Sequence, residues 1–183
     1  MTGDEPHRPP GLQDDEVEAL FVRMERPLFN VVYRWVWDRD EAAELVQEAF
    51  ARLWQARARV RVDTAAAFVH RIAINLAASK RRWRRLRKFL APEDAPEPTS
   101  ERPDEAVLGA ERAAAVRAAV DALPEKLRRA LILCELSEMS YAEVAAALEI
   151  PVGTVGSRRN AAVARMREQL LKKEQSHESA VRR

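Results

Sequence analysis

The chain has 183 residues and a formal net charge of +2, which is long enough for one domain or two small ones. Only 5 glycines, abundant Ala, Leu, Arg and Glu, and no run of alternating Val, Ile and Thr predict an all-helical protein. Cys134 is the single cysteine, which excludes an intrachain disulfide and favours a reducing compartment around an inert, buried thiol. No apolar run is long enough to span a membrane, and the acidic, proline-rich start is unlike a signal peptide, so we expect a cytoplasmic protein without membrane insertion.

The chain opens with residues 1–13, which we expect to be disordered, and a helical pattern then begins at Asp15. Pro27 interrupts this pattern and predicts either a kink or a junction of two helices. One apolar stripe runs through it and predicts a buried face. The stripe consists of Val17, Leu20, Phe21, Met24, Leu28, Val31, Val32 and Trp35.

A second, shorter helix follows, with Asp38 and Glu41 at the spacing of a capping box. Its predicted apolar face consists of Leu45, Val46, Ala49, Phe50, Leu53 and Trp54. The opposite face is polar and includes Glu44, Gln47 and Glu48. The residues alone leave two readings of that face, a solvated surface or a docking surface.

The segment 68–90 begins as an amphipathic helix and ends as a block of positive charge. Phe68, Ile72 and Leu76 recur at helical spacing, and Thr64 is the predicted N-cap. Like charges at i,i+4 destabilise a helix by a few tenths of a kcal/mol each, so a polyphosphate backbone is the expected counterpart. A solvated helix end or an unstructured basic run is the alternative. The block consists of Lys80, Arg81, Arg82, Arg84, Arg85, Arg87 and Lys88.

Residues 91–105 contain four prolines and six acids, which predict an extended, solvated linker. At about 3.1–3.6 Å per residue it would reach on the order of 50 Å. This exceeds one turn of DNA, which is about 34–36 Å. Two helical domains joined in this way would be able to contact separate sites on one duplex.

The second half of the chain predicts a helix-turn-helix. Pro124 is placed as a first helical position, and Ser140 with Glu143 forms a capping box. Ala145 and Val155 lie where the motif needs a small and an apolar residue. Residues 149–151 form the turn, and the polar tail from 172 is expected to fray.

The second helix of this motif carries polar residues suited to DNA. Arg and Asn make paired contacts with guanine and adenine in the major groove, and Ser or Thr near a helix N-terminus binds phosphate. An antiparallel helix pair without a role in DNA binding would show the same pattern. The candidate residues for duplex recognition are Thr154, Ser157, Arg158, Arg159 and Asn160.

Three segments in this order, 40–54, 68–82 and 122–158, resemble the extracytoplasmic-function (ECF) sigma factors of bacterial RNA polymerase. The resemblance covers residues 16–171 and implies two small helical domains, sigma2-like over 14–90 and sigma4-like over 106–171, with a tail at 172–183. It implies a factor that binds core polymerase through the β′ clamp helices and the β flap, directs it to promoter DNA and helps to melt the −10 element. It also implies an anti-sigma partner, no catalytic activity, no metal and no cofactor.

The resemblance also assigns roles to residues. The intact L-V-Q-E at 45–48 implies that Glu44, Gln47 and Glu48 contact the clamp helices, and Asn75 corresponds to a residue that captures a flipped base. From the residues alone, Asn75 is equally suited to cap a helix or face solvent, and Trp83 to stack on a base or anchor the core. The residues implied for the −10 strand are Arg71, Asn75, Lys80, Arg81, Arg82, Trp83, Arg84 and Arg85.

The sequence departs from the family at four positions, and two other functions remain open. Glu149 replaces a glycine of the bend, Gly156 a basic residue, and Ala161 and Val163 two arginines. If the bend is left-handed, Glu149 would lower the stability of the fold by about 1–2 kcal/mol. The lost cations predict weaker −35 binding.

Two alternative functions stay open. One is an ordinary regulator that binds duplex DNA, and the other is a sigma-like protein that only sequesters partners. The promoter sequence and the inducing signal do not follow from the sequence.

Overall fold

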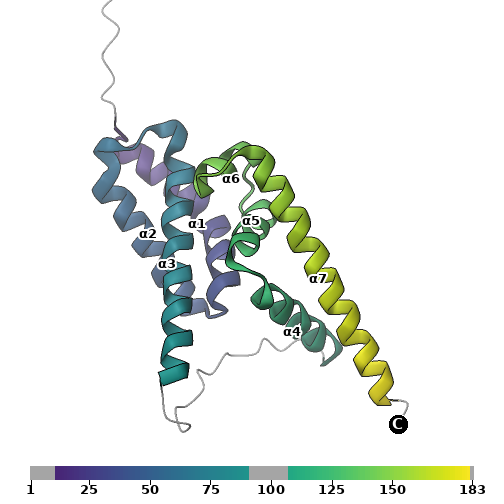
Figure 1. Ribbon diagram of the computed structural model, residues 1–183. Coiled ribbons are helices and arrows are strands. Elements are labelled where there is room, and N and C mark those ends of the chain that lie inside the picture. The colour runs from purple at the N-terminus through teal and green to yellow at the C-terminus, as the bar shows by residue number, and fades with distance from the viewer. Residues whose placement is uncertain (1–10, 91–106, 182–183) are drawn as a thin grey trace, which may run out of the picture.

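The computed structural model describes residues 11–90 and 107–181, and these residues form seven α-helices and one short 3-10 helix without a strand. The prediction of an all-α protein is therefore confirmed. The helices form two groups, an N-terminal group of α1–α3 and a C-terminal group of α4–α7 (Figure 1). The predicted linker 91–105 and residues 1–10 lie outside the described part of the chain, and the proposed domain bounds stay predictions. The helices are α1 (Asp14–Val36), α2 (Arg39–Ala56), α3 (Val62–Leu90), α4 (Val107–Ala122), α5 (Glu125–Leu136), α6 (Tyr141–Leu148) and α7 (Val152–Val181), with the 3-10 helix at Arg57–Arg59.

Helix α1 is one continuous helix that passes through Pro27, so the predicted junction of two helices is wrong. Seven residues of its predicted apolar stripe are buried, and Phe21 is half-buried. The helix is preceded by ordered chain, because Leu12 is buried and its amide donates to the carbonyl of Arg57 at 2.8 Å. Disorder was expected through residue 13, and this expectation fails at Leu12 because its apolar side chain completes the core.

Helix α2 starts at an N-cap, as predicted, but only half of the capping box forms. The amide of Glu41 donates to Asp38 Oδ1 at 2.9 Å, whereas the carboxylate of Glu41 turns toward α3. Val46, Ala49, Phe50 and Leu53 are buried against α1 and α3. Trp54 was expected on this apolar face but is 41% exposed, and the guanidinium of Arg57 lies 4.2 Å from its ring centroid.

Helix α3 begins at Val62, three residues before the start that an N-cap at Thr64 predicts, so Thr64 lies in its first turn instead of capping it. The Thr64 hydroxyl donates to the carbonyl of Arg61 at 3.2 Å. The helix continues to Leu90 and includes the whole basic block, which excludes the unstructured alternative. Its basic end projects below the rest of the N-terminal group (Figure 1).

The C-terminal group contains the predicted helix-turn-helix in α6 and α7. Ser140 and Glu143 form the expected capping box, with amide-to-side-chain distances of 2.8 and 3.3 Å, and Ala145 and Val155 are both buried. Pro124 is the N-cap of α5, one position before the first helical residue where it was expected. Helix α7 continues to Val181, so the expectation that the chain frays from 172 is wrong.

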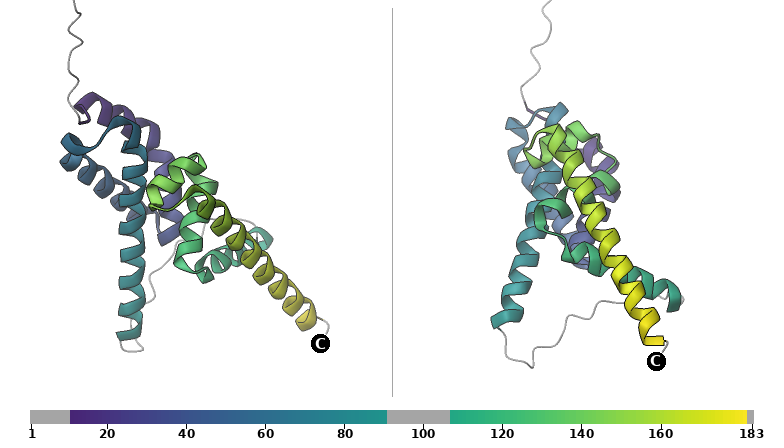
Figure 2. Two further views of the ribbon diagram at one scale, coloured as in Figure 1. Left: turned by 45° about the horizontal axis from the view of Figure 1, so that its top comes forward. Right: turned by 45° about the vertical axis from the view of Figure 1, so that its right-hand side comes forward.

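The two groups pack against each other. Helix α6 packs on α3, and α5 packs on α1, so that one continuous cluster of buried apolar side chains includes residues of both groups. Helix α2 lies on the side of α3 that faces away from α6 and α7 (Figures 1 and 2). Some of the candidate −10 residues on α3 therefore lie next to the C-terminal group, while α2 lies on the other side of α3.

Candidate nucleic-acid and polymerase interface

The candidate −10 residues all come from α3, whose long helix fixes their spacing. Arg71 is half-buried and Asn75 is exposed, one turn further along the helix. Trp83 is 64% exposed, so the alternative in which it anchors the core is excluded. An exposed indole on a basic helix is able to stack on an unpaired base.

Two of these residues serve the packing of the N-terminal group. Arg84 Nη2 lies 2.6 Å and Lys80 Nζ 3.3 Å from the carboxylate of Glu41, which is only 9% exposed. Arg84 Nη1 also donates to the carbonyl of Val36, at the end of α1, at 2.9 Å. These contacts join α3 to α1 and α2, so Lys80 and Arg84 already have partners inside the protein. Sequence reasoning used Glu41 only as a capping residue and missed this role.

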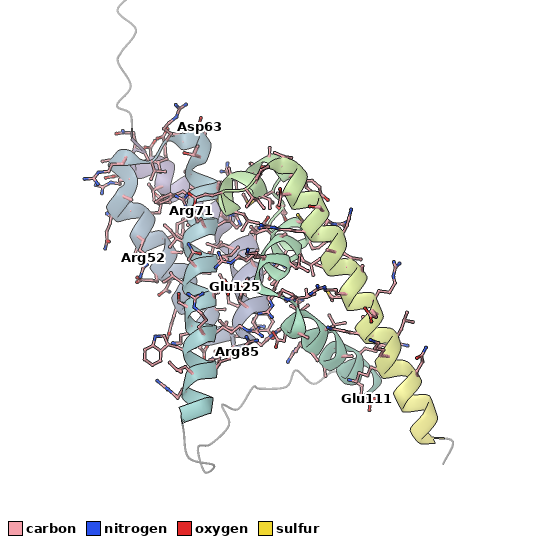
Figure 3. All side chains as sticks on the ribbon, in the orientation of Figure 1. Arg52, Asp63, Arg71, Arg85, Glu111 and Glu125 are labelled. Carbon is pink, nitrogen blue, oxygen red and sulfur yellow. The ribbon has the colours of Figure 1, made fainter. Side chains whose placement is uncertain are left out.

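Four other candidate −10 residues contact the C-terminal group. Arg71 pairs with Glu149, and Arg81 pairs with Asp121. Arg82 Nη1 lies 3.6 Å from Glu125 Oε2. Arg129 Nη1 donates to Asn75 Oδ1 at 2.8 Å. Figure 3 shows side chains from both groups meeting between α3 and α5, with Arg71 and Glu125 labelled. Arg85 is exposed and makes no ion pair with the described residues.

The candidate clamp surface on α2 is open. Glu44, Gln47 and Glu48 are all exposed, on the face opposite the buried Val46 and Phe50. Glu48 accepts from Arg52 Nε at 2.7 Å in an i,i+4 pair that leaves both side chains about half exposed, at 49% and 52%. Such a pair stabilises the helix by only a few tenths of a kcal/mol, so it does not prevent docking.

The candidate recognition residues lie in the first turns of α7. Ser157 donates to the carbonyl of Thr154 at 3.1 Å, and Asn160 is exposed. Arg159 donates to Glu135 Oε1 at 2.7 Å, and this bond raises the pKa of Arg159. Arg158 is half-buried. The helix therefore presents Asn160 freely, while Arg159 has to exchange Glu135 for any base or phosphate.

The structure shows the surroundings of three of the four positions that depart from the family. Glu149 has φ 54° and ψ 48°, the left-handed conformation in which a side chain was expected to cost stability. Val163 packs against the small cluster of Leu123, Leu131 and Ala162, so an apolar side chain is favoured there. A side chain added at Gly156 would meet only Tyr141 Cε2, at 3.6 Å, so space does not explain its glycine.

Arg128 is a residue whose role sequence reasoning missed. It is 3% exposed, stacks 5.3 Å from the Trp35 ring, and donates to three main-chain carbonyls at the end of α4. Burial, followed by repulsion from Arg81, lowers the pKa of Arg128 to about 10, so it stays charged at neutral pH. The sequence does not reveal this role, because the acceptors are main-chain carbonyls and an arginine on a short helix otherwise resembles any exposed cation.

Two further titratable groups, His70 and Cys134, lie in surroundings that favour their neutral forms. His70 is buried, its Nδ1 lies 2.9 Å from the carbonyl of Ala66, and burial lowers its pKa. Burial raises the pKa of the Cys134 thiol, which keeps it protonated and unreactive. Within residues 11–90 and 107–181 no three His, Cys, Asp or Glu side chains converge as metal ligands, and no helix there is long and apolar enough to cross a membrane.

Two family models match the chain in this order: Sigma-70 region 2 over residues 20–89, and Sigma-70, region 4 over residues 113–166. The chain is 34% identical over 152 residues to the RNA polymerase sigma-H factor of Pseudomonas aeruginosa, covering 77% of this chain and 79% of that protein. It is 33% identical over 150 residues to the ECF RNA polymerase sigma-E factor of Escherichia coli, covering 76% and 78%. This chain is an ECF sigma factor of the sigma-70 family.

Further comparisons agree with this membership. The ECF RNA polymerase sigma factor SigE of Mycolicibacterium smegmatis is 32% identical over 152 residues, which are 79% of this chain but 58% of that longer protein. Two solved structures share the fold at 21% identity. CnrH in complex with the cytosolic domain of CnrY has a TM-score of 0.65 and covers 86% of this chain and 89% of its own. RpoE in complex with the anti-sigma factor NepR from Bartonella quintana has a TM-score of 0.63 and covers 86% of this chain and 98% of its own. Sigma factors are initiation factors and not enzymes, so this one is not an enzyme.

Proposed function

We propose that this sigma factor binds core RNA polymerase, directs it to a class of promoters, and helps to open the −10 element by holding an unpaired base. The observation that carries the proposal is the presence, in one chain, of both sigma regions together with an exposed polar face at 44–48. A regulator that only bound duplex DNA would need the C-terminal helix-turn-helix alone.

The proposed core contact is the exposed face of α2, formed by Glu44, Gln47 and Glu48. Two carboxylates and an amide at this spacing suit a basic or polar helical partner such as the β′ clamp helices. Helix α2 lies on the side of α3 away from the C-terminal group, and the three side chains are exposed, so polymerase would reach them whether or not the two groups are in contact. The C-terminal group would contact the β flap.

The proposed −10 site lies along α3. Asn75 offers an amide that is able to read a base edge, and Arg71 lies one turn away to hold a phosphate. Trp83 supplies an exposed ring for stacking, and Arg81, Arg82 and Arg85 would steer the strand. Lys80 and Arg84 would contribute positive potential while they keep their contacts with Glu41.

The proposed −35 site is the start of α7. Thr154 and Ser157 would bind phosphates near the helix N-terminus, and Arg158, Arg159 and Asn160 would read bases in the major groove. Neutral residues at 156, 161 and 163 would leave this site with fewer phosphate contacts than its relatives. Each lost contact would make the salt dependence of duplex binding shallower by roughly one unit of slope.

The setting of this activity follows from the same chemistry. A sigma factor works where RNA polymerase and DNA are, so we place it in the cytoplasm, which agrees with its single protonated thiol. An anti-sigma partner is part of the proposal. Of the two solved structures that share the fold, RpoE is in complex with the anti-sigma factor NepR, and CnrH is in complex with the cytosolic domain of CnrY.

Reconstitution with two variants tests the residue roles. Asn75→Ala should bind core polymerase as the unchanged protein does but form open complexes more slowly, because the base contact is lost and the other contact of Asn75, with Arg129, lies outside the proposed core-binding face. The triple change Glu44→Ala, Gln47→Ala and Glu48→Ala should weaken core binding itself. Equal loss of core binding in both variants would contradict the assignment. A protein that only sequesters partners would bind core without promoter opening in any form.

A further inference from the structure

A cavity of about 350 Å³ lies where α3 faces the end of α4 and the start of α5, and Trp35 of α1 also lines it. This volume is near the lower end of the range for ligand pockets, which is about 300–1,000 Å³. It equals the volume of roughly twelve waters at about 30 Å³ each, so it holds more than a single ion. The charged residues of its lining are Arg81, Arg82, Arg85, Asp121, Glu125 and Arg128.

The cavity lining is positively charged, because four guanidinium groups face two carboxylates and leave two positive charges. One of these carboxylates is drawn away, since Glu125 accepts at 2.7 Å from Arg129, which does not line the cavity. Burial and then repulsion from Arg81 lower the pKa of Arg128, and repulsion from Arg85 acts in the same direction. The cations around the cavity therefore repel one another, and an anion between them would be attracted to all of them.

Several N–H donors of the residues around the cavity have no acceptor within the described part of the chain. Trp35 is 2% exposed, and its buried indole Nε1 has no partner there; the same holds for the buried Nε of Arg81. Helix α5 starts after Pro124 without a side-chain cap, so the first amides of this helix lack a side-chain acceptor. Buried donors in folded proteins nearly always have a partner, so this group of donors points to an acceptor-rich ligand.

We propose that this cavity binds a small diphosphate anion, either inorganic pyrophosphate or the diphosphate of a nucleotide, which bridges the two helical groups. Guanidinium groups donate charge-assisted hydrogen bonds to phosphate oxygens, and the start of a helix adds free amides and a favourable dipole. Arg82 and Arg85 come from α3, while the free amides come from α5, so one ligand contacts both groups. This site is independent of the proposed function, because it needs neither polymerase nor promoter DNA.

The cavity suits a small anion better than the exposed basic end of α3 does. Exposed charges are hydrated and screened by salt, whereas buried walls lower the local dielectric and strengthen attraction. Arg128 is already held in place by three main-chain carbonyls, and its Nη1 makes no hydrogen bond with the described residues. A guanidinium fixed in this way loses little conformational entropy when it binds a phosphate.

Calorimetric titration of the full-length protein with inorganic pyrophosphate tests the site, and we expect a dissociation constant below about 1 mM. The cavity variant carries Arg82→Gln and Arg85→Gln, two exposed lining residues whose replacement leaves the buried walls intact. The control carries Arg165→Gln and Arg167→Gln, two exposed positions on α7 that remove the same charge away from the cavity. Circular dichroism verifies that both variants are folded. The cavity variant should bind at least about tenfold more weakly, and the control within about twofold of the unchanged protein. Equal weakening in both variants would show that net charge alone attracts the anion and would overturn the site.

Nuclear magnetic resonance of the same protein labelled with nitrogen-15 locates the anion. Trp35 lines the cavity, whereas Trp83 is exposed on α3 and does not line it. Saturating pyrophosphate should shift the indole N–H signal of Trp35 and the amide signals of Glu125 and Lys126, and should leave the indole signal of Trp83 in place. Trp35→Phe assigns the indole signal. A shift of Trp83 without Trp35, or no saturable binding of pyrophosphate, would overturn the proposal.

Titrations with ADP and with adenosine identify the source of the diphosphate. Tighter binding of ADP than of pyrophosphate would support a nucleotide, and equal or weaker binding of ADP would support free pyrophosphate. Adenosine should not bind, because it lacks the phosphates that the arginines and the helix start contact. If adenosine bound as tightly as ADP, phosphate recognition in this cavity would be wrong.

Discussion

Arg128 is expected to be among the most important polar residues for stability. Its guanidinium donates to the carbonyls of Val120 at 2.8 Å and Leu123 at 2.9 Å, both in buried surroundings, and to that of Asp121 at 2.6 Å at the edge of the core. The Val120 carbonyl also accepts from the amide of Leu123 at 3.2 Å, and the Asp121 carbonyl from Arg81 Nη2 at 3.0 Å. Among the described residues, the Leu123 carbonyl accepts from Arg128 alone. Removal of the guanidinium leaves the buried Leu123 carbonyl unpaired, which costs about 1–3 kcal/mol, and removes a charge-assisted hydrogen bond from each of the other two carbonyls. The buried charge no longer has to be desolvated, which offsets part of this loss.

Arg128→Ala should therefore lower the free energy of unfolding by about 2–4 kcal/mol. For a chain of this size, this corresponds to a fall in melting temperature of roughly 5–15 °C. Thermal and urea unfolding followed by far-ultraviolet circular dichroism measure both quantities. Lys126→Ala, at an exposed position on the same helix, is the matched control and should cost less than about 0.5 kcal/mol. If both variants lose the same small amount, the carbonyl contacts do not hold α4 and the reasoning is refuted.

Three further predictions concern single side chains. Burial lowers the pKa of His70, so its neutral form is favoured in the folded protein. The free energy of unfolding should therefore fall as the pH drops below about 6.5, by at most about 1.4 kcal/mol per pH unit. Urea unfolding at several pH values should show a smaller loss of stability at low pH in His70→Leu than in the unchanged protein. Ser140→Ala should cost about 1 kcal/mol in urea unfolding by removing the cap of α6, and an unchanged midpoint would contradict this. Glu149→Gly should raise the free energy of unfolding by about 0.5–1 kcal/mol and Glu149→Gln should not, because only glycine relieves the strain of the left-handed backbone. A gain in both variants would show that the charge of Glu149, and not its backbone conformation, sets the stability at this position.

Local patterns predicted most of the fold. The apolar stripe of α1, the cap at Asp38 and the capping box at Ser140 depend on neighbours within one or two turns, and all three appear as expected. The left-handed bend at Glu149 was also predictable, because it follows from the geometry of a helix-turn-helix. Errors concentrate where a distant residue intervenes. The Leu12 side chain is ordered by packing, and its amide by the carbonyl of Arg57.

The partners of the charged residues could not be predicted. Arg71 and Glu149 are 78 positions apart, and nothing local shows which of many acids a given arginine meets. The same holds for Arg128, whose acceptors are main-chain carbonyls that every residue carries. Composition identified a basic helix, but only the fold divides its cations into those that hold α3 in place, such as Arg84, and those that face the other group, such as Arg81.

Promoter-dependent initiation tests the central claim most directly. Purified full-length protein would be added to core RNA polymerase free of other sigma factors, with fragmented genomic DNA as template, and run-off transcripts would be sequenced. We predict discrete transcripts whose start sites share upstream elements at −10 and −35, and no such transcripts from core alone. The absence of discrete transcripts in the presence of demonstrated core binding would contradict the account.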